Sequence, residues 1–211
     1  MAGSSKNDII AAQAGQYYSD KFLAYGPTPQ GVDWNGIESQ FVRFEQLSKA
    51  MSHEKGDAKF KLLDYGCGYG AFYEFIKDKF PSVEYTGYDI SNEMIDYARN
   101  RHGDAKWKSE ISVANNFDYV VASGLFNVKQ QVAEREWQDY VLAEIETMNK
   151  LSRKGLAFNL LTKYSDEDKM KPYLFYAEPS YYFDLCKRKY SRNIALLHDY
   201  NLFEFTIIIR K

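Results

Sequence analysis

The chain has 211 residues, which is the size of a single domain and too short for two enzyme domains with a linker. The 27 Lys and Arg residues nearly balance the 29 Asp and Glu residues, so the net charge of −2 argues against binding nucleic acid through overall charge. No apolar run approaches the roughly 18 residues of a membrane span, and the start lacks a signal-peptide pattern. Two cysteines are too few for a disulfide framework or a thiolate metal site. We therefore expect a reduced, cytoplasmic protein without a metal.

Residues 1–59 are predicted to form a helical cap. Asn7–Leu23 has a mild helical pattern with Asn7 or Asp8 as a possible N-cap, and Ile37–Met51 repeats apolar residues at helical spacing. Between them, Gly and Pro residues punctuate Tyr25–Gly31, which is typical of a loop. We therefore expect two helices ahead of the first strand.

Strands and helices alternate over residues 60–211, which we expect to form the main structural unit. The expected strands are Phe60–Tyr65, Val83–Ile90, Ala105–Lys108, Phe117–Ser123, Leu156–Leu161, Ile194–His198 and Leu202–Arg210. The expected helices are Ala71–Phe80, Asn92–Arg101, Glu134–Leu151 and Pro179–Lys189. Ser91 is expected as an N-cap, Gly155 as a C-cap, and Asp199–Asn201 as the turn of a terminal hairpin. This order predicts a doubly wound α/β sheet with an antiparallel strand at its end.

A glycine-rich turn follows the first expected strand. Asp64–Gly70 reads Asp-Tyr-Gly-Cys-Gly-Tyr-Gly, and its glycines allow a sharp turn and a close approach of the backbone to a ligand. Asp89 lies 25 residues after Asp64, at the end of the second strand, where a carboxylate can accept both hydroxyls of a ribose. Together they predict a nucleoside-binding crevice.

The glycine pattern alone fits two cofactors. Gly66, Gly68 and Ala71 also satisfy the dinucleotide fingerprint of nicotinamide enzymes. The two preceding helices, the acid before the first glycine and the terminal hairpin favour S-adenosylmethionine instead. A nicotinamide-dependent oxidoreductase and a non-catalytic module that binds S-adenosylmethionine remain as alternatives.

The sequence resembles the class I S-adenosylmethionine-dependent methyltransferases. The matching segments are Leu62–Gly70, Tyr85–Ile90, Phe117–Ser123 and the terminal hairpin, and the resemblance extends over residues 60–211. It implies a seven-stranded sheet in the order 3-2-1-4-5-7-6, with strand 7 antiparallel and the methyl donor over the ends of strands 1, 2 and 4.

The resemblance also implies roles in binding the donor. Asp64 and the turn amides would face the methionine part, and Asp89 would bind the ribose. Ile90 and Met94 would pack against the two faces of the adenine, and Glu110 would accept from its amino group. The cofactor-binding residues implied in this way are Asp64, Gly66, Cys67, Gly68, Asp89, Ile90, Met94, Glu110 and Ser123. We interpret Cys67 as a small side chain between glycines rather than a nucleophile.

The methyl acceptor is expected over the ends of strands 4 and 5. Asn127 follows an apolar strand directly and is a candidate to orient the acceptor, and His198 is a candidate general base. The candidate substrate-binding aromatics are Tyr18, Trp34, Tyr164 and Tyr176. The segment after strand 4 lacks the Asn-Pro-Pro-Tyr signature of some amino-group methyltransferases, which lowers the expectation of nitrogen methylation.

A narrower resemblance concerns three short segments. Tyr25–Trp34, Ser123–Val128 and Ala195–Tyr200 are similar to small bacterial methyltransferases associated with surface-polysaccharide biosynthesis. This likeness implies a small-molecule or sugar-linked substrate that is methylated at oxygen.

Overall fold

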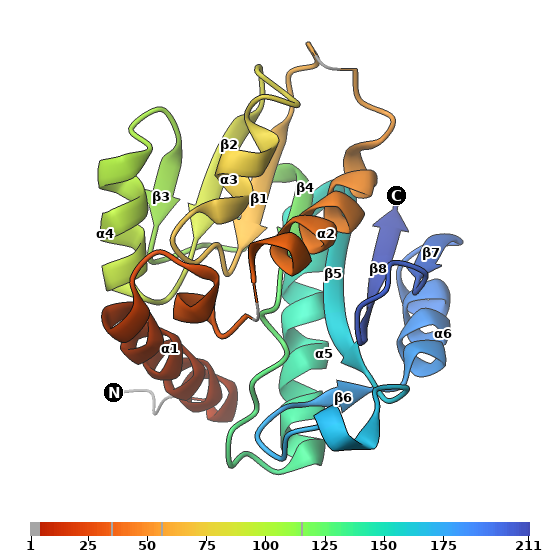
Figure 1. Cartoon of the computed structure of the whole chain (residues 1–211). Helices are drawn as coiled ribbons and strands as arrows, with labels where there is room; N and C mark the ends of the chain where they lie inside the picture. The colour runs from red at the N-terminus through yellow and green to blue at the C-terminus, as the bar shows by residue number, and fades with distance from the viewer. Residues whose placement is uncertain (1–4, 35, 56, 115) are drawn as a thin grey trace.

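A computed structural model describes residues 5–34, 36–55, 57–114 and 116–211. Its sheet has the strand order β3-β2-β1-β4-β5-β8-β7, and a short strand, β6, pairs with β5 (Figure 1). β8 is antiparallel to both β5 and β7, while β1 to β6 pair in parallel. With β8 as the seventh strand and β7 as the sixth, the predicted order is confirmed, and the two-residue β6 is an addition to it.

The elements lie close to their predicted positions. The strands are β1 (Lys61–Tyr65), β2 (Glu84–Tyr88), β3 (Lys106–Lys108), β4 (Phe117–Ala122), β5 (Ser152–Thr162), β6 (Tyr176–Ala177), β7 (Asn193–Leu197) and β8 (Glu204–Arg210). The α-helices are α1 (Lys6–Tyr25), α2 (Ile37–Ser48), α3 (Ala71–Ile76), α4 (Asn92–Arg101), α5 (Glu134–Leu151) and α6 (Pro179–Lys189). The 3₁₀ helices are η1 (Pro29–Val32), η2 (Lys49–Met51) and η3 (Glu167–Lys169).

Each face of the sheet has its own hydrophobic core. Side chains alternate along β1, so Leu62 packs in one cluster with residues of α2, α3 and α4. Leu63 packs in the other cluster, with residues of α5 and α6. Among the described residues, no helix is both long and apolar enough to cross a membrane.

The predicted C-cap at Gly155 is wrong. α5 ends at Leu151 and β5 begins at Ser152, so Gly155 lies inside the strand. A Cβ at this position would lie 2.6 Å from the carbonyl oxygen of Ile209. The glycine therefore allows the close approach of β8 rather than ending a helix.

The predicted N-cap of α1 also differs from the observed one, which is Ser5. The Asp8 amide donates to Ser5 Oγ over 3.2 Å, and the Ser5 amide donates to the Asp8 carboxylate over 2.8 Å. This reciprocal capping box makes Asp8 the third residue of the helix instead of its cap.

α1 lies across the ends of β1 and β2 (Figure 1). Gly15 packs so closely on Ile90 that a Cβ would lie 2.4 Å from Cγ2 of Ile90. Four residues further along, Ser19 Oγ donates to Ser91 Oγ over 2.8 Å. These contacts place the N-terminal helix over the carboxyl ends of the strands, where α/β sheets bind ligands.

Candidate active site

A cavity of about 320 Å³ opens at the carboxyl ends of β1, β2 and β4. Its lining comes from one face of α1, from Trp34, from Gly66–Tyr69 of the glycine turn, from the end of β2, from Ser123–Leu125 and from α5. The volume falls in the range of about 300–1,000 Å³ that is typical of small-molecule sites. Because the resemblance implies that a methyl donor binds over these strand ends, we call it the donor cavity.

The glycine turn is held by the end of β2. The amides of Gly66 and Cys67 donate to the Tyr88 carbonyl oxygen over 2.8 and 2.9 Å. The Gly68 amide donates to Oδ2 of Asp89 over 2.8 Å. Gly68 has a φ of 54°, a left-handed conformation that favours glycine. Hydrogen bonds donated by its main-chain amides therefore fix the position of the turn relative to the end of β2.

Two carboxyl groups face the donor cavity beside the turn. Asp64 is 1% exposed, and its Oδ2 accepts a 2.6 Å hydrogen bond from the Tyr85 hydroxyl. Its Oδ1 accepts no hydrogen bond from the described part of the chain. Burial, opposed by the Tyr85 hydrogen bond and assisted by the nearby Asp89 carboxylate, raises the pKa of Asp64 to about 7. Burial also raises the pKa of Asp89 above its usual value.

One side of α1 forms the opposite wall. Ala11, Ala14, Gly15 and Tyr18 follow one another at helical spacing along this side and line the cavity. Small side chains at the first three positions leave room for a ligand under the helix. The Tyr18 hydroxyl lies 3.4 Å from the Gly124 carbonyl oxygen and connects α1 with the loop after β4.

Sequence reasoning missed an acidic side chain on α5. Glu144 lines the cavity together with Tyr65 and Tyr140, and its Oε2 accepts a 2.7 Å hydrogen bond from the Tyr65 hydroxyl. Burial raises the pKa of Glu144, and Asp8 on α1 contributes in the same direction. The available signal was the one-turn spacing of Tyr140 and Glu144, which places an acid next to the apolar side of the helix.

Most of the predicted cofactor residues meet in the donor cavity. The predicted residues that line it are Tyr18, Trp34, Asp64, Gly66, Cys67, Gly68, Asp89, Ile90, Met94 and Ser123. The Cys67 thiol is buried, which raises its pKa and opposes a nucleophilic role. Ser123 Oγ is buried and forms no hydrogen bond with the described residues.

Other predicted residues lie outside the donor cavity. Glu110 is exposed and is absent from its lining. Asn127 is buried behind the loop that follows β4, and its Oδ1 accepts no hydrogen bond from the described residues. β7 ends at Leu197, so His198 lies in an exposed connection instead of a strand.

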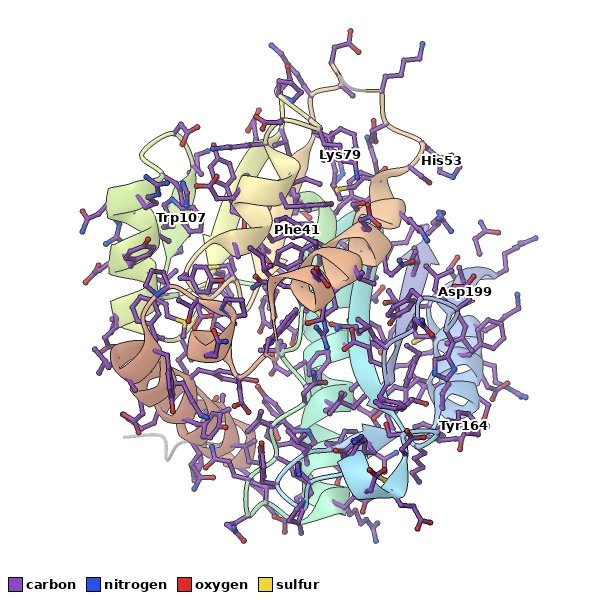
Figure 2. The ribbon with its side chains drawn as sticks, in the orientation of Figure 1. Phe41, His53, Lys79, Trp107, Tyr164 and Asp199 are labelled. Carbon is purple, nitrogen blue, oxygen red and sulfur yellow. The ribbon has the colours of Figure 1, made fainter. Side chains whose placement is uncertain are left out.

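The predicted aromatics from the second half of the chain also lie elsewhere. The Tyr164 ring packs 5.9 Å from the His198 ring, and Figure 2 shows Tyr164 on the side of α6, away from α1. Tyr176 lines a second hollow of about 330 Å³ together with Lys129 and Lys163. The structure therefore brings Tyr18 and Trp34 to the donor cavity and leaves Tyr164 and Tyr176 outside it.

Comparisons with known proteins identify methyltransferases as similar proteins. A family model described as a methyltransferase domain matches residues 63–151. A protein of Mycobacterium tuberculosis that is named as a methyltransferase is 44% identical over 155 residues, which are 72% of this chain and 93% of that protein.

Solved structures share the fold at low sequence identity. The plantazolicin methyltransferase BpumL in complex with S-adenosylhomocysteine is similar with a TM-score of 0.64 and 14% identity, over 98% of both chains. The magnesium protoporphyrin IX methyltransferase of Synechocystis PCC 6803 with bound S-adenosylmethionine is similar with a TM-score of 0.62 and 11% identity, over 100% of both chains.

Proposed function

The chain belongs to the class I S-adenosylmethionine-dependent methyltransferases, and we propose that it methylates an oxygen atom of a small molecule or glycan precursor. The observation that carries the proposal is the donor cavity, in which a fixed glycine turn, two acids and the N-terminal helix surround one nucleoside-sized space. The relatives that match are methyltransferases, so a nicotinamide oxidoreductase receives no support from them.

The donor cavity suits the parts of S-adenosylmethionine. We assign the ribose to Asp89, because its carboxylate lines the cavity at the end of β2, where it can accept ribose hydroxyls in addition to the backbone N–H groups of Gly68 and Ser91. The methionine part falls to Asp64 and the glycine turn. Ile90 and Met94 lie next to Asp89 in the lining and would pack against the adenine.

The adenine amino group is assigned to Glu144 in place of Glu110. Glu144 faces the donor cavity among tyrosine rings, whereas Glu110 is exposed outside it. A carboxyl oxygen accepts a hydrogen bond from an exocyclic amine and not from the carbonyl of a 6-oxopurine. Glu144→Gln should therefore reduce the preference for S-adenosylhomocysteine over S-inosylhomocysteine.

The control for this assignment is Glu146→Gln, two residues along the same helix, where the carboxylate pairs with Lys189 at 2.7 Å outside the cavity. Calorimetry with both ligands compares the two variants. An unchanged ligand preference in Glu144→Gln would reject the assignment.

When bound, S-adenosylmethionine would supply a methyl group on a sulfonium, so that an O–C bond to the acceptor forms as the C–S bond breaks, S-adenosylhomocysteine leaves and the acceptor hydroxyl gives up its proton. The protein's part is alignment, which contributes about 7–11 kcal/mol to reactions of this kind. Tyr18 and Trp34 lie at the cavity wall and are proposed to bind the acceptor, since aromatic faces stack on sugar rings. A role for Asn127 in orienting the acceptor stays a prediction, because this side chain is buried outside the cavity lining. A base role for His198 remains a prediction.

Support for oxygen as the acceptor atom comes from the sequence after β4. Ser123-Gly124-Leu125-Phe126 stands where some amino-group methyltransferases have Asn-Pro-Pro-Tyr. The experiment is methyl transfer from a donor with a ¹³C-labelled methyl group to a panel of sugar phosphates, sugar nucleotides and amines. The expected product carries an O-methyl carbon signal. Products methylated only at nitrogen would overturn the proposal.

A further inference from the structure

A chain of buried polar side chains lies behind the donor cavity. Glu204 at the start of β8 is 0% exposed, and its Oε1 lies 2.6 Å from Nε of Arg43 on α2. Its other oxygen, Oε2, accepts a 3.0 Å hydrogen bond from Nδ2 of Asn159 on β5. We call Arg43, Glu204 and Asn159 the Glu204 network.

Both ends of the Glu204 network reach the wall of the donor cavity. The Arg43 guanidinium lies 4.1 Å from the ring centre of Trp34. Asn159 Oδ1 accepts a 2.8 Å hydrogen bond from the Gly124 amide. Trp34 and Gly124 both line the cavity, and Glu204 itself does not.

The two ends also meet each other. Gly124 has a φ of 71°, and a Cβ built on it would lie 2.6 Å from Cζ2 of Trp34. The contacts therefore form a closed ring that joins the segment before α2 to the loop after β4. A shift of one of these two wall segments requires a shift of the other or a break in the ring.

Stability alone is a weak reason for such a network. Burial raises the pKa of Glu204, and Arg43 opposes that shift. Buried ion pairs are often no more stabilising than well-packed apolar residues of similar volume. A fixed geometry at both ends explains why two charges are held inside the protein.

We propose that Glu204 is a positioning residue for methyl transfer, which fixes Trp34 through Arg43 and the Gly124 amide through Asn159 at the wall of the donor cavity. The proposal requires only that this cavity holds the donor, and it does not depend on the acceptor.

The test separates positioning from folding with three variants. Glu204→Gln keeps the size of the side chain and an acceptor for Asn159 but leaves Arg43 unpaired. The double variant Arg43→Gln with Glu204→Gln removes both charges. Glu54→Gln is the control, because Glu54 forms an ion pair of similar length, 2.8 Å, with Lys154 away from the donor cavity.

We expect Glu204→Gln to bind S-adenosylhomocysteine about tenfold more weakly than the natural protein, because loss of the ion pair frees the wall. The double variant should regain the natural melting temperature, since no charge is left unpaired, and should keep the weak binding. The control should bind as the natural protein does. If Glu204→Gln does not fold, the affinity of the double variant for S-adenosylhomocysteine decides whether the proposal holds.

A spectroscopic measurement follows Trp34 directly. The sequence has three tryptophans, so protein labelled with 5-fluorotryptophan gives three ¹⁹F resonances, and Trp34→Phe assigns one of them. In the double variant the Trp34 resonance should move while those of Trp107 and Trp137 stay. Natural affinity in the double variant, an unmoved Trp34 resonance, or an equal shift of all three would overturn the proposal.

Discussion

The donor cavity has two walls that are held in different ways. The turn wall consists of Asp64–Gly70 and Asp89. Its main-chain amides donate hydrogen bonds to the Tyr88 carbonyl oxygen at the end of β2 and to the Asp89 carboxylate. The cap wall consists of α1 and Trp34. Its contacts join segments that are far apart in the sequence, such as the Ile90 side chain on Gly15 and the Trp34 ring on Gly124. Changes in the turn wall should therefore have larger effects on donor binding than changes in the cap wall.

The largest effect is expected at Gly68. A valine there would have to adopt a φ of 54°, and its side chain would point into the donor cavity. Gly68→Val should reduce the affinity for S-adenosylhomocysteine by more than about 100-fold, since strain and loss of ligand space act together. Calorimetry measures this.

The control for Gly68 is Gly103→Val, because a Cβ at Gly103 meets no atom within 4 Å. Cooperative melting of both variants shows that they fold. Natural affinity in a folded Gly68→Val protein would show that the ligand lies elsewhere.

The next effect is expected at Asp89, also in the turn wall. Asp89→Ala removes a charged acceptor for the ribose and should weaken binding of S-adenosylhomocysteine by about 1.5–3 kcal/mol, the range for hydrogen bonds to charged groups. The same substitution at Asp96, an exposed acid on α4 whose side chain is 66% exposed, is the matched control. Equal affinities for the two variants would exclude the ribose assignment.

A pH dependence of intermediate size should come from Asp64. Its pKa is raised to about 7, so the carboxyl is mostly protonated at pH 6 and ionised at pH 8. A cationic donor favours the ionised form, so binding releases a proton and tightens as pH rises. Affinity for S-adenosylmethionine should increase by about tenfold from pH 6 to pH 8.

Calorimetry in two buffers of different ionisation enthalpy detects the released proton. Asp64→Asn should bind with a smaller pH dependence, with the remainder due to Asp89 and Glu144, whose pKa values burial also raises. A pH dependence that is equally steep in Asp64→Asn would assign it to other groups.

The smallest effect is expected in the cap wall at Gly15. Gly15→Ala places a Cβ 2.4 Å from Ile90 Cγ2, so α1 has to move away from Ile90. Donor affinity should fall about fivefold, at the lower end of the cost of overpacking. Gly103→Ala is the control, and a loss as large as that of Gly68→Val would remove the difference between the walls.

The turn wall could be predicted from the sequence because its contacts are local. The glycines of residues 66–70 and the acid at position 89 follow consecutive strands. Glycine indicates a sharp turn of the backbone, and the acid indicates a negative charge at the strand end. The alternation of strands and helices predicted the α/β class with an antiparallel strand at the end, and the strand order was implied by the resemblance alone. The C-cap at Gly155 was predicted wrongly, because glycine is needed there for the close approach of β8. The local sequence around Gly155 does not indicate which strand lies next to it.

Tyr18 and Trp34 of the cap wall were also predicted, but the side chains that distant elements bring to the cavity and to the network behind it could not be. Glu144 and the Glu204 network depend on contacts such as that between Arg43 and Glu204, which are 161 residues apart in the sequence. Glu110 and His198 were chosen by their places in the chain, and the structure leaves both outside the donor cavity. A single sequence gives no signal for such pairings, because an isolated Arg or Glu reads as a surface residue.

Hydrogen exchange with and without S-adenosylhomocysteine tests the two-wall account most directly. The ligand should slow amide exchange in Gly66–Tyr69 and also in Ala11–Tyr18 of α1, because both segments line the donor cavity. Exchange in α6, which contributes nothing to that lining, should stay the same. Slower exchange in the glycine turn with no change in α1 would contradict the account, since the N-terminal helix would then not be part of the donor site.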